Sequence, residues 1–203
     1  KNIRKNNCSV GIKSLFEVSD KDNTRATTQD LGFYIGPILN AAGRLDDISL
    51  GIECLLTNDY QKALTLAKKL KEINNQRQII ESEMQIEAKN ILTKISPTNN
   101  STISIFNPSW HQGVIGIIAS KIKEEFYRPT IVFAESNFET IKGSGRSIQG
   151  FNIRDAIDLI SKNYPSLILT FGGHAMAVGL TLKKKNFEFF SNAFEQIGKQ
   201  ILS

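Results

Sequence analysis

The sequence predicts an α/β protein, in which a compact C-terminal domain with a mixed sheet is preceded by a long connecting helix and a mainly helical segment. Between Gly51 and Pro97 the 203-residue chain contains neither glycine nor proline, which is typical of one long helix. After Pro97, short β-branched runs alternate with helical patterns, as they do in α/β domains. The composition, with 40% hydrophobic and 22% charged residues, indicates a globular chain and excludes a disordered or fibrous one.

The segment before the long helix, residues 1–56, is expected to be mainly helical. A polar loop is predicted over 19–30 and a glycine-rich turn over 36–43. A short helix is predicted over 47–56, because the two carboxylates at 46–47 suit an N-cap and a first turn, although metal ligation is the alternative role for them.

The long helix itself is expected within residues 57–97. Asn58 and Gln61 have the spacing of a capping box at its start, and apolar residues then recur at three-, four- and seven-residue intervals. At 1.5 Å per residue such a helix is about 57 Å long, more than one compact domain of this size needs, so we expect it to connect two bodies. A coiled-coil dimer is the competing account. It is disfavoured because Arg77 interrupts the apolar stripe and the flanking charges are irregular.

The compact domain is expected over residues 98–203. Its predicted strands are β-branched or apolar runs at 102–106, 130–134, 139–142 and 178–182. Its predicted helices have helical periodicity and lie at 114–125, 153–161 and 187–202.

Charge and cysteine usage narrow the classes of function. The formal net charge is +5, from 25 basic and 20 acidic residues, and the excess lies in the C-terminal half. Residues 140–154 contain three cations and no carboxylate, a local field that attracts an anionic ligand, although a solvated surface is the alternative. Cys8 and Cys54 have no CxxC spacing, which argues against a disulfide framework or a cysteine-based zinc cluster and favours inert thiols.

The sequence has no feature of a membrane or secreted protein. Its apolar runs are far shorter than the roughly 20 residues of a bilayer-spanning helix. The polar start KNIRKNNCSV lacks the apolar region of a secretory signal, so a cytoplasmic location is expected.

Three motifs combine glycines with isolated polar groups, namely NAAGRLDD (40–47), KGSGRS (142–147) and FGGHAMAVG (171–179). In KGSGRS, Ser144 offers a hydroxyl and Arg146 a planar fork that matches phosphate oxygens, while Gly145 is expected to let the backbone approach a ligand. The spacing is that of neither a P-loop nor a dinucleotide fingerprint, so a tight hairpin is the alternative.

The two histidines are weaker candidates. His174 follows Gly173, and an imidazole there is suited to donating to a phosphate, although a structural histidine is the alternative. His111 precedes a predicted helix whose N-terminus favours anions. Trp110 beside it is a candidate for stacking on a base, although burial in the core is the commoner fate of tryptophan.

Five segments, in their order along the chain, closely resemble the RecJ family of single-stranded-DNA-specific exonucleases, which belongs to the DHH phosphoesterases. The resemblance runs from about Gly11 to the C-terminus. The segments are LGFYIGPILNAAGRLDD, WHQGVIGIIASKI, RPTIVF, KGSGRSIQGFNIRDAI and FGGHAMAVGLTL.

The resemblance implies a division into three parts. Residues 1–56 correspond to the C-terminal remnant of a DHH phosphoesterase domain, 57–97 to the connecting helix and 98–203 to the DHH-associated domain. In this family the DHH domain holds two divalent ions, Mn²⁺ or Mg²⁺. The present residues contain no DHH motif, and the D-x-D at Asp20 and Asp22 lies in a polar loop, so we expect a piece of a longer protein that itself binds no metal.

The resemblance also implies the contacts with DNA. The substrate-binding residues are expected to be Arg44, Ser144, Gly145, Arg146, Gly173 and His174, with Trp110, His111, Lys142 and Gln149 as further candidates. The partner is expected to be single-stranded DNA, and the full-length enzyme is expected to act as a monomer, 5′ to 3′, in DNA repair and recombination. The alternatives are a phosphodiesterase for short oligonucleotides or cyclic dinucleotides, and a non-catalytic nucleic-acid-binding module.

Overall fold

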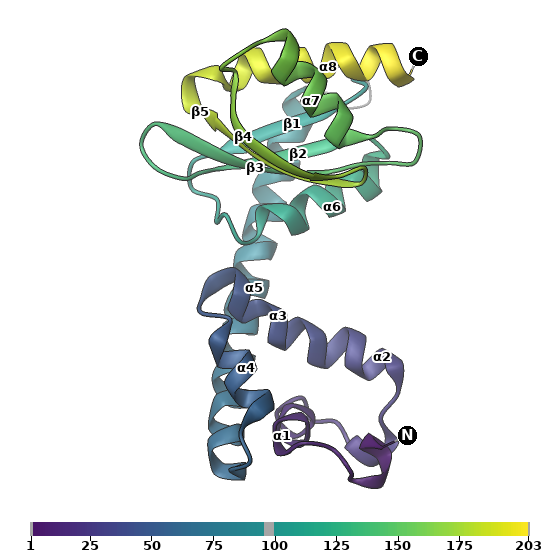
Figure 1. Ribbon diagram of the computed structural model, residues 1–203, viewed down its shortest axis with the longest axis vertical. Helices are drawn as coiled ribbons and strands as arrows, with labels where there is room; N and C mark the ends of the chain where they lie inside the picture. The colour runs from purple at the N-terminus through teal and green to yellow at the C-terminus, as the bar shows by residue number, and fades with distance from the viewer. Residues whose placement is uncertain (1, 96–99, 203) are drawn as a thin grey trace. The chain divides into compact units, whose positions relative to one another are not determined.

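The computed structural model describes residues 2–95 and 100–202. They form two compact units, Lys1–Ile79 and Ile80–Ser203, and the boundary between the units falls inside the long helix α5 (Tyr60–Ile95) (Figure 1). The predicted long helix is therefore present, and it contributes residues to both units. No helix among the described residues is long and apolar enough to cross a membrane.

The first unit is helical. Its main helices are α1 (Val10–Val18), α3 (Gly36–Leu45), α4 (Ser49–Leu56) and the first part of α5. Leu15 and Phe16 of α1, Cys54 of α4 and Leu70 of α5 are fully buried or nearly so in one apolar cluster. Burial raises the pKa of the Cys54 thiol, which keeps the thiol protonated and agrees with an inert cysteine.

The predicted turn over 36–43 is wrong, because these residues lie inside helix α3. Pro37 stands in the first turn of this helix, directly after a π-helical turn, and its fixed φ suits the helix. The segment before α3 is not a plain loop either. It contains a 3₁₀ turn (Asn23–Arg25), the short helix α2 (Thr28–Asp30) and a π-helical turn (Leu31–Ile35).

A reciprocal capping box begins α2. The Asp30 backbone N–H donates to Thr27 Oγ1 over 3.1 Å, and the Thr27 N–H donates to Asp30 Oδ2 over 2.8 Å. The hydrogen bonds from Thr27 lower the pKa of Asp30. Because the folded pKa lies below the unfolded value, the box stabilises the fold at neutral pH, and this stabilisation is lost as the pH falls through the lowered pKa.

The second unit is built on a five-stranded sheet in the order β1-β2-β3-β5-β4. Strand β1 is parallel to β2, and the other neighbouring pairs are antiparallel. The strands are β1 (Ile103–Asn107), β2 (Thr130–Glu135), β3 (Thr140–Arg146), β4 (Ile168–His174) and β5 (Ala177–Lys183). This sheet and the helices around it confirm the predicted mixed α/β fold.

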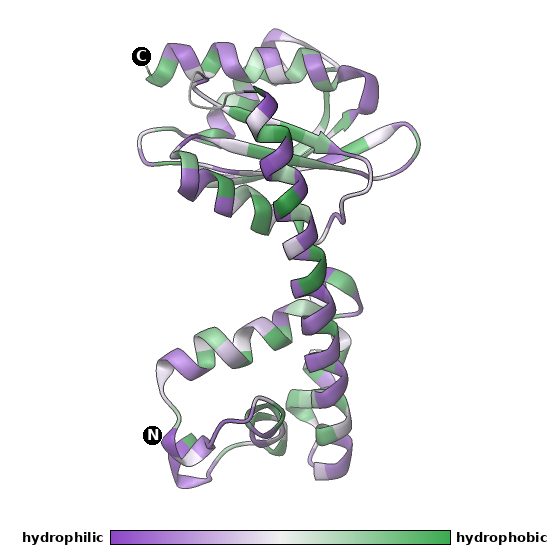
Figure 2. Ribbon diagram, turned by 180° about the vertical axis from the view of Figure 1, so that it is seen from behind, coloured by the Kyte–Doolittle hydropathy of each residue, from purple (hydrophilic) through white to green (hydrophobic). Residues whose placement is uncertain are grey.

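Three helices cover the sheet from its two sides (Figure 1). Helices α7 (Ile153–Asn163) and α8 (Phe187–Leu202) pack on one face, where they bury an extensive apolar cluster. Helix α6 (Ile115–Phe126) packs on β2 and β3. In Figure 2, hydrophobic and hydrophilic residues alternate along α8, as expected of a helix with one buried side.

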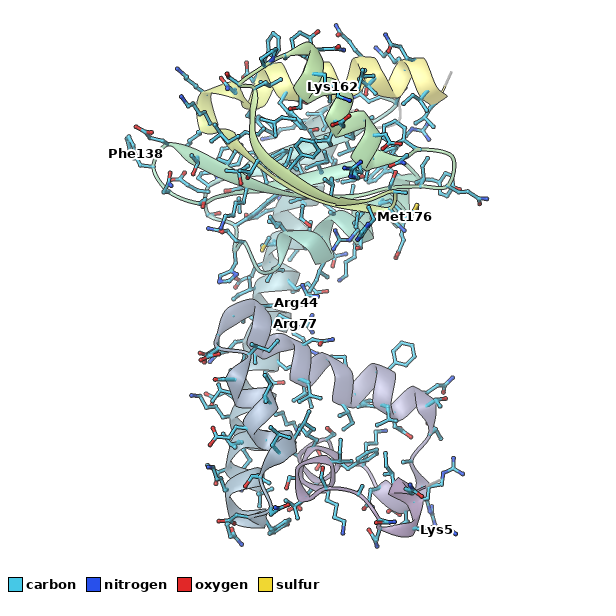
Figure 3. The ribbon with its side chains drawn as sticks, in the orientation of Figure 1. Lys5, Arg44, Arg77, Phe138, Lys162 and Met176 are labelled. Atoms are coloured by element: carbon cyan, nitrogen blue, oxygen red, sulfur yellow. The ribbon has the colours of Figure 1, made fainter. Side chains whose placement is uncertain are left out.

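The sequence prediction missed β4. Gly172, Gly173 and His174 have low strand propensity, and they hid a strand that pairs with β5 through a hairpin closed by Ala175 and Met176. Met176 lies at the tip of this hairpin (Figure 3).

A carboxylate ties the last helix to the first strand. Glu195 of α8 accepts hydrogen bonds from the backbone N–H groups of Ser101 and Thr102 over 2.9 and 2.8 Å, and from the Thr102 hydroxyl over 2.8 Å. These bonds satisfy backbone donors just before β1 begins.

The start of α5 differs by one residue from the predicted cap. Asp59 Oδ1 accepts from the backbone N–H groups of Gln61 and Lys62 over 2.8 and 3.2 Å, so Asp59 caps the helix and Asn58 does not. Asp59 stands directly before the first helical residue, where its carboxylate reaches these donors.

The cap gives a first prediction. Asp59→Ala should lower the free energy of unfolding by about 1 kcal/mol, because two N–H groups of the first turn lose their acceptor. Urea denaturation measures this change. Asn58→Ala is the control and should leave the midpoint unchanged. A greater loss for Asn58→Ala than for Asp59→Ala would place the cap one residue earlier.

Candidate functional site

The KGSGRS motif is a strand, not a turn. Its residues form most of β3, so their side chains alternate between the two faces of the sheet. A Cβ on Gly143 would lie 2.5 Å from Phe133 Cε1, and one on Gly145 would lie 2.7 Å from Val178 Cγ1 and 2.8 Å from Ile153 Cδ1. These two glycines therefore face the core beneath α7 and allow close packing there. A backbone contact between Gly145 and a ligand stays a prediction.

Ser144 and Arg146 lie on the opposite face of β3. Arg146 Nη1 donates to Ser144 Oγ over 3.1 Å and to the Gly145 carbonyl oxygen over 2.8 Å. Both side chains are half-buried. The structure thus brings together the two residues of the motif that were predicted to hold a phosphate.

The first turn of α6 lies against this pair. A Cβ on Gly116 would stand 3.0 Å from both Arg146 Nη2 and Ser144 Oγ. A hydroxyl, a guanidinium and the first turn of α6 therefore meet at one place on the sheet. The N–H groups of Ile115 and Ile117 in this turn already donate to the carbonyl oxygens of His111 and Val114, so the helix adds its dipole here. The sequence named His111, before α6, as a candidate for anion binding. In the structure it is Gly116 that lies beside Ser144 and Arg146.

His174 lies in line with Arg146 across the sheet. Arg146 pairs with Ala177 of β5, and Ala177 pairs with His174 of β4. His174 is exposed at the end of β4. Gly173 before it has φ +152°, and a Cβ there would stand 2.3 Å from the Ala177 carbonyl oxygen, so the hairpin itself requires this glycine.

The remaining candidates are dispersed. Lys142 is exposed on β3, on the same face as Ser144, and Gln149 is exposed in the connection after β3. His111 is exposed before α6, and its Nδ1 accepts from the Gly113 N–H over 3.0 Å. Arg44 belongs to the first unit, where it is exposed near the end of α3 (Figure 3).

Trp110 does not offer a surface for base stacking. Its side chain is 4% exposed, and its Nε1–H donates to Glu87 Oε2 of α5 over 2.7 Å. The ring is therefore a core residue of the second unit whose polar edge is satisfied by a carboxylate, which is the common fate of a buried tryptophan.

A metal centre does not fit the described residues. Residues 2–95 and 100–202 contain no group of three or more histidine, cysteine, aspartate or glutamate side chains placed to hold an ion. Asp22 of the D-x-D accepts instead from the N–H and hydroxyl of Thr24 at 2.8 and 2.7 Å, and these bonds lower its pKa. The Asp22 carboxylate therefore stabilises a local turn.

The packing of β3 gives a second prediction. Gly145→Ala should lower the free energy of unfolding by about 1–3 kcal/mol, because the methyl group overpacks the contact with Val178 and Ile153. Gly32→Ala is the control, because a Cβ at Gly32 meets no atom within 4 Å. Equal denaturation midpoints for the two variants would contradict the packing role of Gly145.

Comparison with known proteins agrees with this fold. Residues 98–200 match the DHHA1 domain family. The chain is 46% identical over 198 residues to the single-stranded-DNA-specific exonuclease RecJ of Escherichia coli, covering 96% of this chain and 34% of that protein. It is 33% identical over 195 residues to RecJ of Bacillus subtilis, covering 96% of this chain and 24% of that protein.

Solved structures give the same relationship. RecJ of Thermus thermophilus, in complex with Mn²⁺, matches with a TM-score of 0.84 and 28% identity, covering 98% of this chain and 28% of that chain. Its complex with Mg²⁺ matches with a TM-score of 0.83 and 27% identity, covering 98% of this chain and 30% of that chain. The chain thus spans about a quarter to a third of the length of these relatives. By its matched residues, its motifs and its fold, this chain belongs to the DHHA1 domain family, and the RecJ exonucleases are its relatives.

Proposed function

We propose that this chain is part of a metal-dependent exonuclease that hydrolyses single-stranded DNA from 5′ to 3′ in DNA repair and recombination, and that it supplies a wall that positions the DNA. The relatives at 45–47% identity are named single-stranded-DNA-specific exonucleases. The observation that carries the proposal is the meeting of Ser144, Arg146 and the first turn of α6 on one face of the sheet.

The chemistry of these groups suits a phosphodiester. The Arg146 guanidinium donates several N–H bonds in a plane, and charge-assisted bonds to phosphate oxygens are stronger than neutral ones. The Ser144 hydroxyl adds a donor, and the helix start adds a favourable dipole. Together they are suited to holding and orienting the strand, and none of the three is a general base that could activate the Ser144 hydroxyl for cleavage.

The hydrolytic step is assigned to residues outside this chain. The described residues do not fit a two-metal site, and the solved RecJ relatives contain Mn²⁺ or Mg²⁺. We therefore propose that the whole protein uses Mn²⁺ or Mg²⁺ held by a DHH domain, of which residues 1–56 are the end. Residues 57–97 are then the connecting helix, and 98–203 the DHH-associated domain.

Further contacts belong to the same proposal. His174, in the row of Arg146, is proposed to donate to a neighbouring phosphate oxygen, and Lys142 to add charge on the same face. Arg44 is proposed as a DNA contact contributed by the first unit. The enzyme is proposed to be a cytoplasmic monomer, and ultracentrifugation of the intact protein tests the monomer.

Binding of single-stranded DNA tests the proposal. In a fluorescence-anisotropy titration with 5′-phosphorylated oligonucleotides, single strands should bind more tightly than duplexes. If Lys142 and Arg146 each neutralise one phosphate, the affinity should fall roughly sevenfold between 50 and 200 mM salt. Equal binding of duplex DNA, or no dependence on salt, would count against a phosphate-binding wall.

Arg146 gives the sharper prediction. In the intact exonuclease, Arg146→Ala should reduce kcat/KM by roughly tenfold or more, because a charge-assisted bond to the substrate is lost. Arg146→Lys should recover only part of the activity, since lysine lacks the planar fork. Thermal denaturation is the control. A fall in Tm as large as that of a core variant such as Gly145→Ala would assign Arg146 to folding and not to the substrate.

A further inference from the structure

A carboxylate of the long helix holds the connection that leads into α6. Glu87 Oε2 of α5 accepts from the Trp110 Nε1–H over 2.7 Å and from the Asn107 side-chain amide over 3.1 Å. Asn107 ends β1, and Trp110 is buried in the connection that follows it. A buried indole N–H needs an acceptor, and an ionised acceptor makes the stronger bond. One oxygen atom of α5 therefore fixes two positions of the segment between β1 and α6.

Asn107 extends the influence of Glu87 into the connection. Its amide nitrogen donates to Glu87, and its Oδ1 accepts from the backbone N–H and the hydroxyl of Ser109 over 2.9 and 2.8 Å. A side-chain amide can donate on one side and accept on the other in only one orientation. The bond to Glu87 therefore fixes the orientation in which Asn107 holds the turn at Ser109.

The connection continues directly into α6. His111 follows Trp110, and its carbonyl oxygen accepts from the N–H groups of Val114 and Ile115 over 3.0 and 3.3 Å. Val114 and Ile115 are both buried, so this stretch is closely packed and has little freedom to move on its own. A displacement of Trp110 is therefore expected to shift the first residue of α6.

The first turn of α6 packs tightly on Ser144 and Arg146. Gly116 is the second residue of the helix, and a Cβ on it would stand 3.0 Å from both Arg146 Nη2 and Ser144 Oγ. The direction of the guanidinium therefore depends on where this turn lies. A misplacement of about 1 Å in a group that positions a substrate can reduce the rate on the order of a hundredfold.

The middle of α6 has a separate attachment to α5. Lys121 Nζ lies 2.7 Å from Glu81 Oε1 and donates to Gln85 Oε1 over 2.9 Å. These contacts do not involve Glu87, so they remain when the Glu87 bonds are lost. Loss of the Glu87 bonds is then expected to displace the connection and the first turn of α6 without detaching the helix.

We propose that Glu87 is a positioning residue for the substrate phosphate. Through Trp110 it sets the first turn of α6, and this turn directs the Arg146 guanidinium toward the phosphate. A carboxylate repels a phosphate, so Glu87 acts through these contacts and not by binding the DNA. The inference rests on the proposed function and extends it to a residue of the connecting helix.

A double-mutant cycle in the intact exonuclease tests this role. Glu87→Ala should reduce kcat/KM on single-stranded DNA roughly fivefold, because the guanidinium is no longer held in place. In the Arg146→Ala background the same change should reduce kcat/KM by less than about twofold, because residues that act through one another have non-additive effects. Glu87→Gln keeps an oxygen acceptor and should recover most of the activity.

Glu195→Ala is the matched control. Glu195 also accepts from two neighbouring donor residues of the second unit, but these are Ser101 and Thr102 before β1. Its removal should lower Tm and yet change kcat/KM, measured well below the Tm, by less than about twofold. If Glu87→Ala does not fold, Trp110→Phe replaces it in the cycle, since phenylalanine keeps a buried aromatic ring and removes only the N–H bond to Glu87 and part of the ring volume.

The outcomes separate positioning from stability. A fivefold loss in both backgrounds would overturn the inference, because Glu87 would then act independently of Arg146. An unchanged kcat/KM for Glu87→Ala would also overturn it, and so would an equal loss for Glu195→Ala, which would make the loss a consequence of stability alone. If the unsubstituted enzyme does not degrade single-stranded DNA, the proposed function fails as well. If Arg146→Ala loses activity while Glu87→Ala keeps it, only the role of Glu87 is wrong.

Discussion

The close packing of β3 against the core is the constraint on which the second unit depends. Gly143 and Gly145 have no room for a Cβ, because Phe133, Leu180, Val178 and Ile153 already fill the space on that side. This packing fixes β3 between β2 and β5, and the alternation of a strand then fixes the direction of every second side chain. Ser144 and Arg146 must therefore point to the opposite face. Tight packing on one side of the strand positions the polar groups on the other.

Much of the fold could be predicted from the sequence, because long periodic segments have strong signals. The absence of glycine and proline between Gly51 and Pro97 predicted α5, and apolar periodicity predicted α8 with the bounds that it has in the structure. The wrong predictions concern segments in which glycine is compatible with a turn, a helix or a strand. Helix α3 contains glycines that suggested a turn, and β4 contains a glycine pair that concealed a strand. In both places tertiary packing overrides local propensity.

The site was predictable in its residue types but not in its arrangement. A hydroxyl and an arginine separated by one glycine indicated phosphate recognition, and the structure places both on one face. Their proximity to Gly116 depends on how α6 crosses the sheet, and the row that joins Arg146 to His174 depends on strand order. Neither follows from spacing in a single sequence. The burial of Trp110 likewise depends on Glu87, which lies 23 residues earlier in α5.

The hydrogen bonds of Glu195 affect how the second unit can be joined to other segments of a chain. They join α8 to Ser101 and Thr102, so the segment just before β1 and the last helix of the unit are held at one place. A domain whose entry and exit lie close together can be joined to different neighbours without disturbing its own interior. One carboxylate of α8 thus allows the segment before β1 to vary without disturbing the sheet or the face that carries Ser144 and Arg146.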